Sequence, residues 1–377
     1  MPYGDTDGAG PFSAVREDKK WFPFFPGDGI IRKEHEKETG SEQDEGMGCK
    51  MTEEHLDEDA IRRAGEILKD GGLVAFPTET VYGLGGNALD AEASRKIYAA
   101  KGRPSDNPLI VHIARMEDLE IVARNIPDNA RKLAQECWPG PLTMILEKTE
   151  VVPLATTGGL NTVAVRFPRN RIAQALIQSA GGFVAAPSAN TSGRPSPTTA
   201  AHVIEDLGDR IDCILDGGMV EIGLESTIVD FTEKTPMILR PGYLNRERLE
   251  QILGTVKVDP GILAEEPAVR PKAPGMRYKH YAPKADLTIV EGPEEKVVQK
   301  IRELAEEQIA RGLTVGIICT DETRRKYSAG DVKSIGARSE EASIARHLYG
   351  ILREFDGDHV DVIYRRRLTH RRWDRQL

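Results

Sequence analysis

The sequence predicts an α/β protein built from two parts. Short apolar runs typical of strands alternate with segments of helical period over residues 51–255, and a shorter form of the same alternation returns over residues 284–377. Residues 256–283, which lie between the two parts, are rich in proline and charge, as is typical of a linker or lid. With 377 residues, 39% of them hydrophobic, the chain is long enough for about two domains with proper cores.

The first 50 residues stand apart from this pattern. They show no sustained period of 2 or 3.6, so we expect a disordered extension. Met47 and Met51 lie just before the first periodic segment, so a coding sequence that begins at one of them is an alternative interpretation. Residues 1–59 hold 16 Asp or Glu against 7 Lys or Arg and account for the whole net charge of -9. Global charge therefore argues neither for nor against a polyanionic ligand, and only a local basic patch could do so.

The elements of the first part follow in order. An apolar helical spacing begins at Leu56 and ends at Gly71-Gly72, and the strand LVAFP follows directly. Further helices are expected at Asp90–Ala100, around Leu133–Cys137 and from about Thr198. Further strands are expected at 109–113, 138–148, 162–168, 181–187, 223–231 and 237–244.

The second part alternates strand and helix in a small β-α-β domain. Strands are expected at Leu287–Val290, Thr314–Cys319 and Val360–Tyr364, and helices at Glu294–Arg311 and Ala342–Phe355. The thirteen residues after Tyr364 contain six arginines and are typical of neither a strand nor an amphipathic helix. This atypical end is either a genuine basic tail or the result of a frameshift near Tyr364.

Two classes of protein are disfavoured by simple features. The four cysteines lie far apart without a C-x-x-C pair, which indicates neither a zinc knuckle nor a disulfide framework and favours the reducing cytoplasm. No stretch of about 18 apolar residues exists, and the N-terminus lacks the layout of a signal peptide, so we expect no membrane insertion.

Polar groups gather at the expected ends of several strands. The segment FPTETVYGLGG places Thr78 after one strand, Ser188 follows another after Pro187, and Arg166 lies near the end of a third. Ligands of open α/β sheets settle at the carboxyl ends of strands, so these loops are expected to meet in one cleft. Taken alone, Thr78 or Ser188 is equally compatible with closing a turn or capping a helix.

A cationic pair favours a phosphate ligand for that cleft. Lys101 and Arg103 are two residues apart and precede Pro104, which biases the chain toward an extended form that points both side chains to one side. Arg166, Arg194 and Arg240 add positive charge, and a cationic, hydroxyl-lined cleft suits a nucleoside triphosphate. Taken alone, the pair is more typical of a solvated surface, and His112 is more typical of a core residue. The spacing of Gly83, Gly85 and Ala88 matches a dinucleotide-binding fingerprint only weakly.

Seven segments together resemble one family. In order they are PTETVYGLG, KGRPSDNPLIVHI, WPGPLT, TVAVRFP, APSANTSGRPSPT, GLESTIVD and LRPG, and they are similar to those of the YrdC/Sua family of L-threonylcarbamoyladenylate synthases over about residues 57–245. The linker APGMRYKHYAP and the domain after it resemble the longer, two-domain Sua type. The resemblance implies a YrdC-like twisted mixed sheet with a cationic concave cleft, and a small C-terminal Rossmann-like α/β domain.

The resemblance also implies a reaction, in which L-threonine, bicarbonate and ATP give threonylcarbamoyl-AMP and pyrophosphate, and a downstream tRNA threonylcarbamoyl-transferase complex uses the product. For threonine it implies Thr78, His112, Arg166, the backbone around Ala186, and Ser226. For ATP it implies Lys101, Arg103, Ser105, Thr162, Ser188, Ser196, Arg240 and Tyr278, of which Lys101 and Arg103 would act on the reacting phosphates.

Three further expectations complete this interpretation. Mg²⁺ is expected to be held mainly through ATP phosphates and water rather than by the protein, since no acidic pair with metal-ligand spacing stands out. The bare backbone at Gly83 to Gly86 is expected to admit substrate closely. The linker is expected to fold over the cleft as a lid, with Tyr278 reaching the nucleotide; a plain spacer is the alternative.

Two rival functions remain open at this stage. An RNA-binding module of the YrdC type, or a weak contact with RNA, would use a basic concave sheet, although an aromatic stacking platform is missing from the sequence. A carbamoyl-phosphate-using transferase of hydrogenase maturation also contains a YrdC-like domain, but the acylphosphatase and zinc-finger segments of that group are not visible in the sequence.

Overall fold

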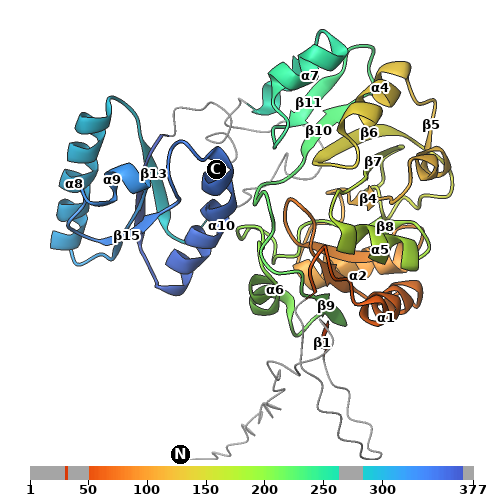
Figure 1. The fold of residues 1–377 in the computed structure, drawn as a ribbon, viewed down its shortest axis with the longest axis horizontal. Coiled ribbons are helices and arrows are strands. Elements are labelled where there is room, and N and C mark those ends of the chain that lie inside the picture. The colour runs from red at the N-terminus through yellow and green to blue at the C-terminus, as the bar shows by residue number, and fades with distance from the viewer. Residues whose placement is uncertain (1–29, 33–50, 263–282, 368–377) are drawn as a thin grey trace, which may run out of the picture.

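The computed structural model describes residues 30–32, 51–262 and 283–367. They form an N-terminal unit (residues 51–262, with the strand at 30–32) and a C-terminal unit (residues 283–367), which lie beside each other (Figure 1). The prediction of an α/β fold in two parts is confirmed, and so is the mixed sheet of the first part. The expected lid or linker and Tyr278 lie outside the described residues.

One large sheet runs through the N-terminal unit. Its strands lie in the order β1 (Ile30–Arg32), β9 (Cys213–Leu215), β2 (Val74–Phe76), β3 (Gly83–Asn87), β8 (Val184–Ala185), β4 (Ile110–His112), β7 (Thr162–Arg166), β6 (Leu142–Lys148), β10 (Thr227–Asp230), β11 (Met237–Arg240) and β12 (Lys257–Val258). The two-residue β5 (Ala123–Arg124) pairs with β6 beside this path. Parallel and antiparallel pairs alternate irregularly, so loops from distant parts of the sequence arrive at the same region of the sheet.

Helices cover the sheet unequally on its two faces. Most of them belong to the core of one face, namely α2 (Ala91–Lys101), α3 (Leu119–Val122), α4 (Asp128–Cys137), α6 (Ala200–Leu207) and α7 (Arg246–Leu253). The other face is covered by α1 (Glu58–Lys69) and α5 (Arg171–Ser179), which pack on β2, β3, β8 and β9. Alternate residues of β2 serve the two cores, with Val74 and Phe76 on one side and Ala75 on the other. The half of the second face formed by β4, β7, β6, β10 and β11 therefore has no helix of this unit over it.

The C-terminal unit is a four-stranded parallel sheet between helices. Its order is β13 (Asp286–Val290), β16 (Val362–Arg366), β14 (Val315–Cys319) and β15 (Asp331–Ser334). Helix α8 (Glu294–Ala310) packs on one face through Val297 and Ile301, and α10 (Glu341–Gly357) packs on the other through Leu352 and Phe355. The short α9 (Asp321–Arg324) follows β14. This arrangement confirms the small α/β domain.

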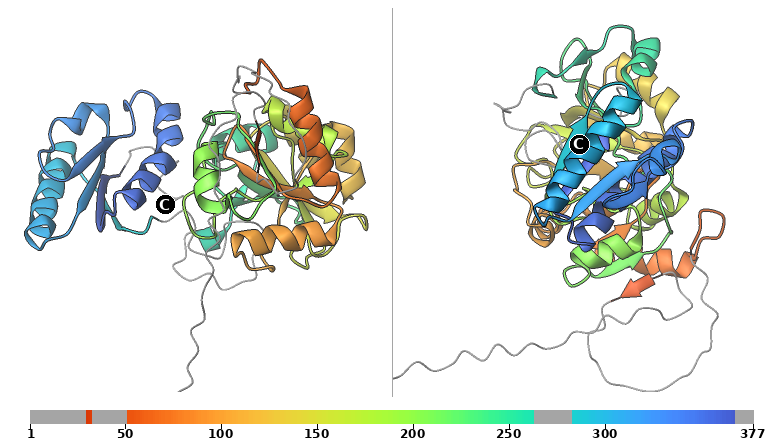
Figure 2. Two further views of the ribbon diagram at one scale, coloured as in Figure 1. Left: turned by 90° about the horizontal axis from the view of Figure 1, so that it is seen from below. Right: turned by 90° about the vertical axis from the view of Figure 1, so that its left-hand side faces the viewer.

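Helix α10 also forms the junction between the units. The dark blue helix lies at the boundary with the N-terminal unit, whereas α8 lies on the far side (Figures 1 and 2). Its apolar cluster includes Val81, Ile222 and Leu224, which belong to the N-terminal unit. Helix α10 is therefore packed on both sides, against its own sheet and against loops of the neighbouring unit.

Several boundaries differ from the sequence predictions. Within the predicted disordered extension, Ile30–Arg32 pairs with β9 as an antiparallel strand. Part of the predicted linker belongs to the N-terminal unit, because β12 pairs with β11 and is followed by a 3₁₀ turn at Pro260–Ile262. Strand β16 continues through Arg366 into the arginine-rich end, because every residue from Val362 to Arg366 pairs in register with β13.

Candidate active site

A cleft lies on the half of the sheet that α1 and α5 leave uncovered, and its space, counted with the open solvent at its mouth, is about 660 Å³. Its lining comes from the loops that follow β2, α2 and β8, from the loop before β10, and from strands β3, β4, β7 and β11. The lining residues are Thr78, Thr80, Val81, Gly83, Lys101, Arg103, Ile110, His112, Arg166, Ala186, Pro187, Ser188, Asn190, Ser192, Gly193, Glu225, Ser226 and Arg240. Four of these side chains are cationic and one is a carboxylate, and several others carry hydroxyl or amide groups.

Strand register explains why these residues meet. His112 pairs with Arg166, Arg166 pairs with Thr143, and residues paired across a sheet share a face. Thr143 in turn pairs with Ile228, which pairs with Arg240. One row across five strands thus carries an imidazole and two guanidinium groups to the open face.

Arg166 is oriented by a buried carboxylate. Its Nη2 donates to Glu79 Oε1 at 2.7 Å, and the other carboxylate oxygen accepts from the backbone N–H of Arg169 at 3.1 Å. Arg166 is 4% exposed and Glu79 1% exposed. The Nε of Arg166 has no hydrogen-bond partner among the described residues, although it is buried. A buried guanidinium with an unused donor beside a cleft is suited to a carboxylate ligand.

The loop after β2 is closed by its own hydroxyl groups. The Thr78 hydroxyl donates to the carbonyl of Val81 at 2.7 Å and accepts from the backbone N–H groups of Thr80 and Val81. The turn-closing interpretation of Thr78 is therefore correct, and Thr78 also lines the cleft beside Arg166. The two roles are compatible, because a closed turn fixes the position of the side chain.

Lys101 and Arg103 both reach the cleft, but from a different backbone than predicted. Lys101 ends helix α2, and Gly102 follows in the left-handed region with φ 61° as the C-cap, so this segment is a helix end rather than extended chain. Arg103 turns back to donate to the carbonyls of Asn107 and Pro108. The prediction that both cations face one cleft is correct, and the extended geometry given as its reason is wrong.

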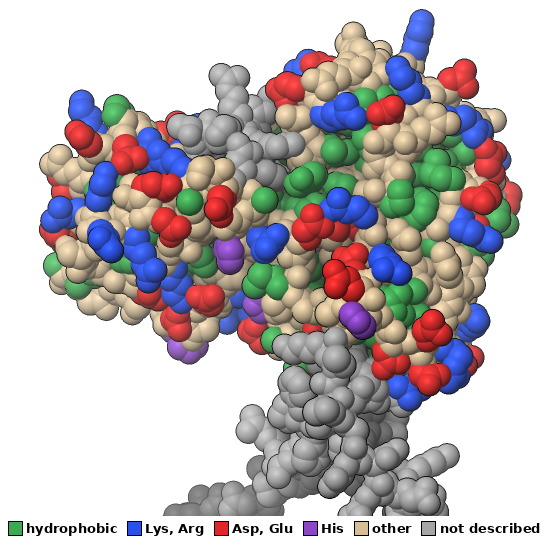
Figure 3. Space-filling view, viewed as in Figure 1, with side chains coloured by type: hydrophobic (Ala, Val, Ile, Leu, Met, Phe, Trp, Pro, Cys, Tyr) green, Lys and Arg blue, Asp and Glu red, His purple; other side chains and the backbone are tan. Residues whose placement is uncertain are grey.

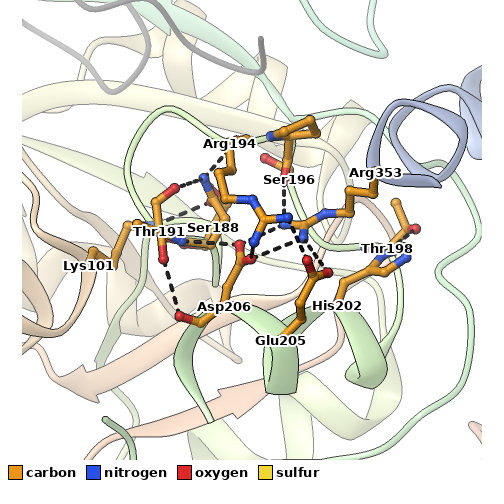
Figure 4. A network of polar contacts seen from close by, with 12 residues as sticks. Lys101, Ser188, Thr191, Arg194, Ser196, Thr198, His202, Glu205, Asp206 and Arg353 are labelled. Carbon is orange, nitrogen blue, oxygen red and sulfur yellow. Dashed lines mark hydrogen bonds and ion pairs between the residues drawn. The ribbon is translucent and has the colours of Figure 1, made fainter. Parts of the chain in front are cut away.

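The ammonium group of Lys101 is enclosed by the loop after β8. It donates to the carbonyl of Ser188 at 2.5 Å and to both the carbonyl and the side-chain oxygen of Asn190 (Figure 4 shows Lys101 and Ser188). Burial, together with the nearby charge of Arg103, holds the pKa of Lys101 well below its usual value. Helix α6 is capped by Thr199, so Ser188 and Asn190 do not cap it, and both line the cleft.

Ser226, directly before β10, and Arg240, at the end of β11, are joined by hydrogen bonds. Arg240 donates to the carbonyl of Ser226 and, at 3.0 Å, to its hydroxyl, which also contacts the hydroxyl of Thr143 at 2.7 Å. Gly242 allows this approach, since a Cβ there would lie 2.4 Å from the backbone nitrogen of Thr227.

His112 is neutral at physiological pH. Burial and the neighbouring Arg166 lower its pKa to about 3. Its Nδ1 lies 3.1 Å from the carbonyl of Ile110, so Nδ1 carries the proton and donates. His112 lines the cleft as a hydrogen-bonding group rather than as a cation.

Some predicted site residues lie apart from the cleft. Ser105 is exposed, and Thr162 begins β7, roughly 13 Å along the strand from Arg166, so neither lines the cleft. The hydroxyl of Ser196 is buried and donates to Glu225, a lining residue, rather than facing the cleft. Arg194 pairs with Asp206 and Glu205, so it does not add its charge to the cleft as predicted. The backbone nitrogen of Ala186 lies at the cleft but is engaged with the carbonyl of Ile110.

The prediction that the bare backbone from Gly83 to Gly86 admits substrate closely is wrong for Gly85 and Gly86. Gly85 and Gly86 lie inside strand β3, and an added Cβ at Gly85 would come within 2.9 Å of Val184 Cγ1 and 3.0 Å of Phe76. At Gly86 it would meet the side chain of Ile97 at 3.1 Å. These glycines give room to core side chains, and only Gly83 faces the cleft.

Sequence reasoning missed several contributors. Glu79 and Glu225 are buried carboxylates inside the recognised motifs, and their charged character in a polar segment was the available signal. Their partners, Arg166 and Tyr349, are 87 and 124 residues away, which no local pattern can show.

Neither the described helices nor the charge on the face in Figure 3 favours a membrane or an RNA partner. The described helices include none long and apolar enough to cross a membrane. On the face shown in Figure 3, Lys and Arg are interspersed with Asp and Glu over both units, rather than gathered into the single-sign surface that an RNA backbone would favour.

Comparison with known proteins agrees with the geometry. The family described as "Telomere recombination" matches residues 66–242, and "Threonylcarbamoyl-AMP synthase, C-terminal domain" matches residues 244–374. The chain is 50% identical over 310 residues to the threonylcarbamoyl-AMP synthase of Pyrococcus abyssi, covering 82% of this chain and 89% of that protein. It is 46% identical over 304 residues to that of Bacillus subtilis, with 80% and 86% covered.

A solved structure shows the same architecture. The crystal structure of P. abyssi Sua5 complexed with L-threonine is similar with a TM-score of 0.79 and 49% identity, over 82% of this chain and 89% of that one. The second family match extends ten residues beyond Tyr364, which favours a genuine basic segment over a frameshift at that residue. Both halves of the chain, and relatives that it covers almost completely, lead to one conclusion: the chain belongs to the threonylcarbamoyl-AMP synthase family, in its two-domain form.

Proposed function

We propose that this chain is an L-threonylcarbamoyladenylate synthase, which makes threonylcarbamoyl-AMP and pyrophosphate from L-threonine, bicarbonate and ATP. The observation that carries this proposal is the pairing of two cationic ends in one cleft. Arg166 with His112 and Thr78 forms one end, and Lys101 with Arg103 and Ser188 forms the other. Such an arrangement suits a carboxylate substrate at one end and a triphosphate at the other.

The threonine end is preorganised within the N-terminal unit. Glu79 holds Arg166 so that its remaining donors face the cleft, and a fixed guanidinium fork can bind the substrate carboxylate. The amino group would then react with bicarbonate to form a carbamate, with loss of water. Neutral His112 and the hydroxyl groups nearby would accept or donate hydrogen bonds without adding charge.

The ATP end supplies electrostatic stabilisation. A carbamate oxygen attacks the α-phosphorus, the bond to the bridging oxygen breaks, and pyrophosphate leaves with the electron pair. Lys101 and Arg103 would stabilise the negative charge that grows on the phosphate oxygens, and Arg240 with Ser188 would position the nucleotide. Positioning and charge account for the rate, because the step needs no protein nucleophile.

Mg²⁺ would enter as part of the nucleotide. The described residues contain no group of three His, Cys, Asp or Glu that could hold a metal ion, and Glu225 is the carboxylate of the cleft lining. This donor set fits an ion that keeps its water and phosphate ligands, and such an ion would neutralise the triphosphate. The product would pass to a transferase complex that modifies an adenosine of tRNA. We place the reaction in the cytoplasm, which is supported by the free thiols of Cys137, Cys213 and Cys319.

Pyrophosphate release tests this proposal. Purified protein is given MgATP with threonine and bicarbonate, with each one alone, and with neither, in carbonate-depleted buffer. We expect rapid release only when both are present, together with a product that carries threonine, the bicarbonate carbon and AMP. Release with threonine alone would show direct activation of the amino acid, and no release under any condition would remove the synthase assignment.

A further inference from the structure

Helix α10 of the C-terminal unit reaches the ATP side of the cleft through two buried side chains. The hydroxyl of Tyr349 donates to Glu225 Oε2 at 2.8 Å. Arg353 donates to both oxygens of Asp206, at 3.1 and 2.7 Å, and to the carbonyl of Pro195 at 2.5 Å. Tyr349 is 0% exposed and Arg353 4% exposed. Both contacts cross from one unit to the other.

The contacts converge on one segment of the N-terminal unit, Ser188–Ser196, which we name the nucleotide loop. Glu225, which accepts from Tyr349, also accepts from the hydroxyl of Ser196 through its other oxygen. Asp206, which accepts from Arg353, also accepts from the backbone N–H of Thr191 at 3.2 Å and pairs with Arg194 (Figure 4). The nucleotide loop is therefore held near its middle and at its end by carboxylates that α10 itself binds.

The loop in turn holds Lys101. Its carbonyls at Ser188 and Asn190 accept from the ammonium group, and the Asn190 side chain fixes the loop internally by donating to the carbonyl of Arg194 at 2.9 Å. A continuous chain of short contacts thus runs from Arg353 through Asp206 and the loop to Lys101. Loss of Arg353 would leave the buried Asp206 with Arg194 and the loop backbone as its remaining partners.

The side chain of Arg166 is oriented without a hydrogen bond from α10 among the described residues. Arg166 is held by Glu79, which is bound by the backbone N–H groups of Arg169 and Asn170, all within the N-terminal unit. Helix α10 thus contacts the threonine end through the apolar side chains of Val81 and Ile222, and the ATP end through hydrogen-bonded carboxylates. A change in α10 should reach the ATP end first.

We propose that Tyr349 and Arg353 are positioning residues for the nucleotide, through which the C-terminal unit sets the geometry of the nucleotide loop and of Lys101. The inference rests on the proposed function, since it assigns that loop to ATP. It gives the C-terminal unit a role in the reaction without a contact to substrate. It differs from simple adhesion between the units, which the apolar contacts of Val81, Ile222 and Leu224 with α10 already provide.

Steady-state kinetics of point variants test the inference. Tyr349→Phe removes one hydroxyl and keeps the ring in its apolar cluster, and Arg353→Met keeps an unbranched, flexible stem without the guanidinium group. For each we expect the KM for ATP to rise roughly tenfold, as for the loss of a hydrogen bond to a buried charge, and the KM for threonine to change by less than about twofold. Arg353→Lys, which keeps the charge but not the paired contact, should lie between Arg353→Met and the unchanged protein.

Arg346→Ala is the matched control. Arg346 lies on the same helix and crosses the same junction, donating to the backbone carbonyl of Glu221 at 2.8 Å, but it does not contact the nucleotide loop. It should leave both KM values unchanged. Thermal melting of every variant separates folding from positioning, and if Arg353→Met does not fold, Tyr349→Phe decides.

The possible outcomes separate cleanly. A selective rise in the KM for ATP in Tyr349→Phe and Arg353→Met, with Arg346→Ala unchanged, supports the inference. Equal rises for ATP and threonine, or unchanged KM values beside a lowered melting temperature, overturn it and leave α10 as a purely structural contact. The proposed function is judged separately by the unchanged protein: if that protein needs both threonine and bicarbonate for pyrophosphate release, failure of the variants to respond counts only against the positioning role.

Discussion

Lys101 is a cation at the end of a helix, buried to 2% exposure and surrounded by oxygen atoms of the nucleotide loop. We expect Lys101→Ala to fold normally and to lose on the order of a hundredfold in kcat, because a fixed charge near developing phosphate charge is worth a few kcal/mol in a water-poor cleft. Initial rates at saturating substrates and circular dichroism measure both properties.

The control for that variant lies on the same helix. Lys96 is exposed, and its ammonium donates to the carbonyl of Gly71 outside the cleft, so Lys96→Ala should retain full kcat. A Lys101→Ala protein with unchanged kcat and KM for ATP would remove Lys101 from the phosphate site.

Arg166 is the group whose geometry matters most for threonine. A lysine there keeps the charge, but a single ammonium cannot both pair with Glu79 and present a fork to a carboxylate. We therefore expect Arg166→Lys to raise the KM for threonine about tenfold and to leave ATP binding, measured alone by calorimetry, nearly unchanged.

Arg169 provides the comparison for Arg166. It pairs with Glu221 at an exposed position, where ion pairs contribute little, so Arg169→Lys should leave the KM for threonine unchanged. Equal losses for threonine and ATP in Arg166→Lys would mean that the residue supports the cleft generally.

Strand β3 is an element whose glycines are required by core packing, although the sequence alone does not show this. Its glycines resemble a ligand-binding loop, yet Gly85 lies against Phe76, Val184 and the backbone of Val74. We expect Gly85→Ala to lower the free energy of unfolding by about 1–3 kcal/mol through overpacking, with little change in the KM for either substrate, as urea denaturation and kinetics would measure.

A comparison with Gly350→Ala makes the test specific. Gly350 lies in helix α10 with nothing within 4 Å of an added Cβ, so alanine there should stabilise the protein by about 0.5–1 kcal/mol. A Gly85→Ala protein of unchanged stability but raised KM would restore the interpretation that substrate approaches this backbone.

The same contrast shows how far the sequence determines the elements. Amphipathic period located α1 and α8, and apolar runs located β2 and β14, because burial of one face leaves a repeating pattern. Strand β3 was missed because three of its five residues are glycine and none is β-branched. Motif order brought Lys101 and Arg166 to one cleft, but the register that aligns Arg166 with His112 is a property of the assembled sheet.

For the molecule as a whole, one buried histidine, His112, and one partly buried histidine, His202, make stability depend on pH. Burial lowers the pKa of His112 to about 3 and that of His202 to about 4, whereas the unfolded chain titrates near 6.5. Below pH 6.5 the two histidines bind protons in the unfolded state but remain neutral in the folded state, which favours unfolding. The folded state therefore has its full stability from these histidines above pH 6.5 and loses it as the pH falls toward 4 and 3.

Replacement of one histidine isolates its share. His202 accepts from the backbone N–H of Thr198, a role that a glutamine side-chain oxygen can take over. We expect His202→Gln to reduce the slope of unfolding free energy against pH by at most about 1.4 kcal/mol per pH unit between pH 6 and 4.5. Urea denaturation at several pH values measures this, and parallel curves for both proteins would contradict it.

The contacts across the junction between the units could not be predicted from the sequence. Arg353 and Asp206 lie 147 residues apart, and each reads locally as an ordinary charged residue on a helix. Only the assembled molecule shows that they are buried together. The glycine at position 223 is also explained only by the junction. An added Cβ there would lie 2.5 Å from the Cα of Arg346, so the close approach of α10 leaves no room for a side chain.

The short strand Ile30–Arg32 covers an edge of the large sheet, so we expect a chain that lacks it to be more prone to self-association. It pairs with β9, whose residues Cys213, Ile214 and Leu215 are all fully buried, at the border of the twelve-stranded sheet. A chain that begins at Met51 would present the outer backbone groups of β9 as an unprotected template for strands of other molecules. We expect such a chain to keep its catalytic rate but to self-associate with rising concentration, which sedimentation velocity would detect; a monomer at all concentrations would show that β1 protects nothing.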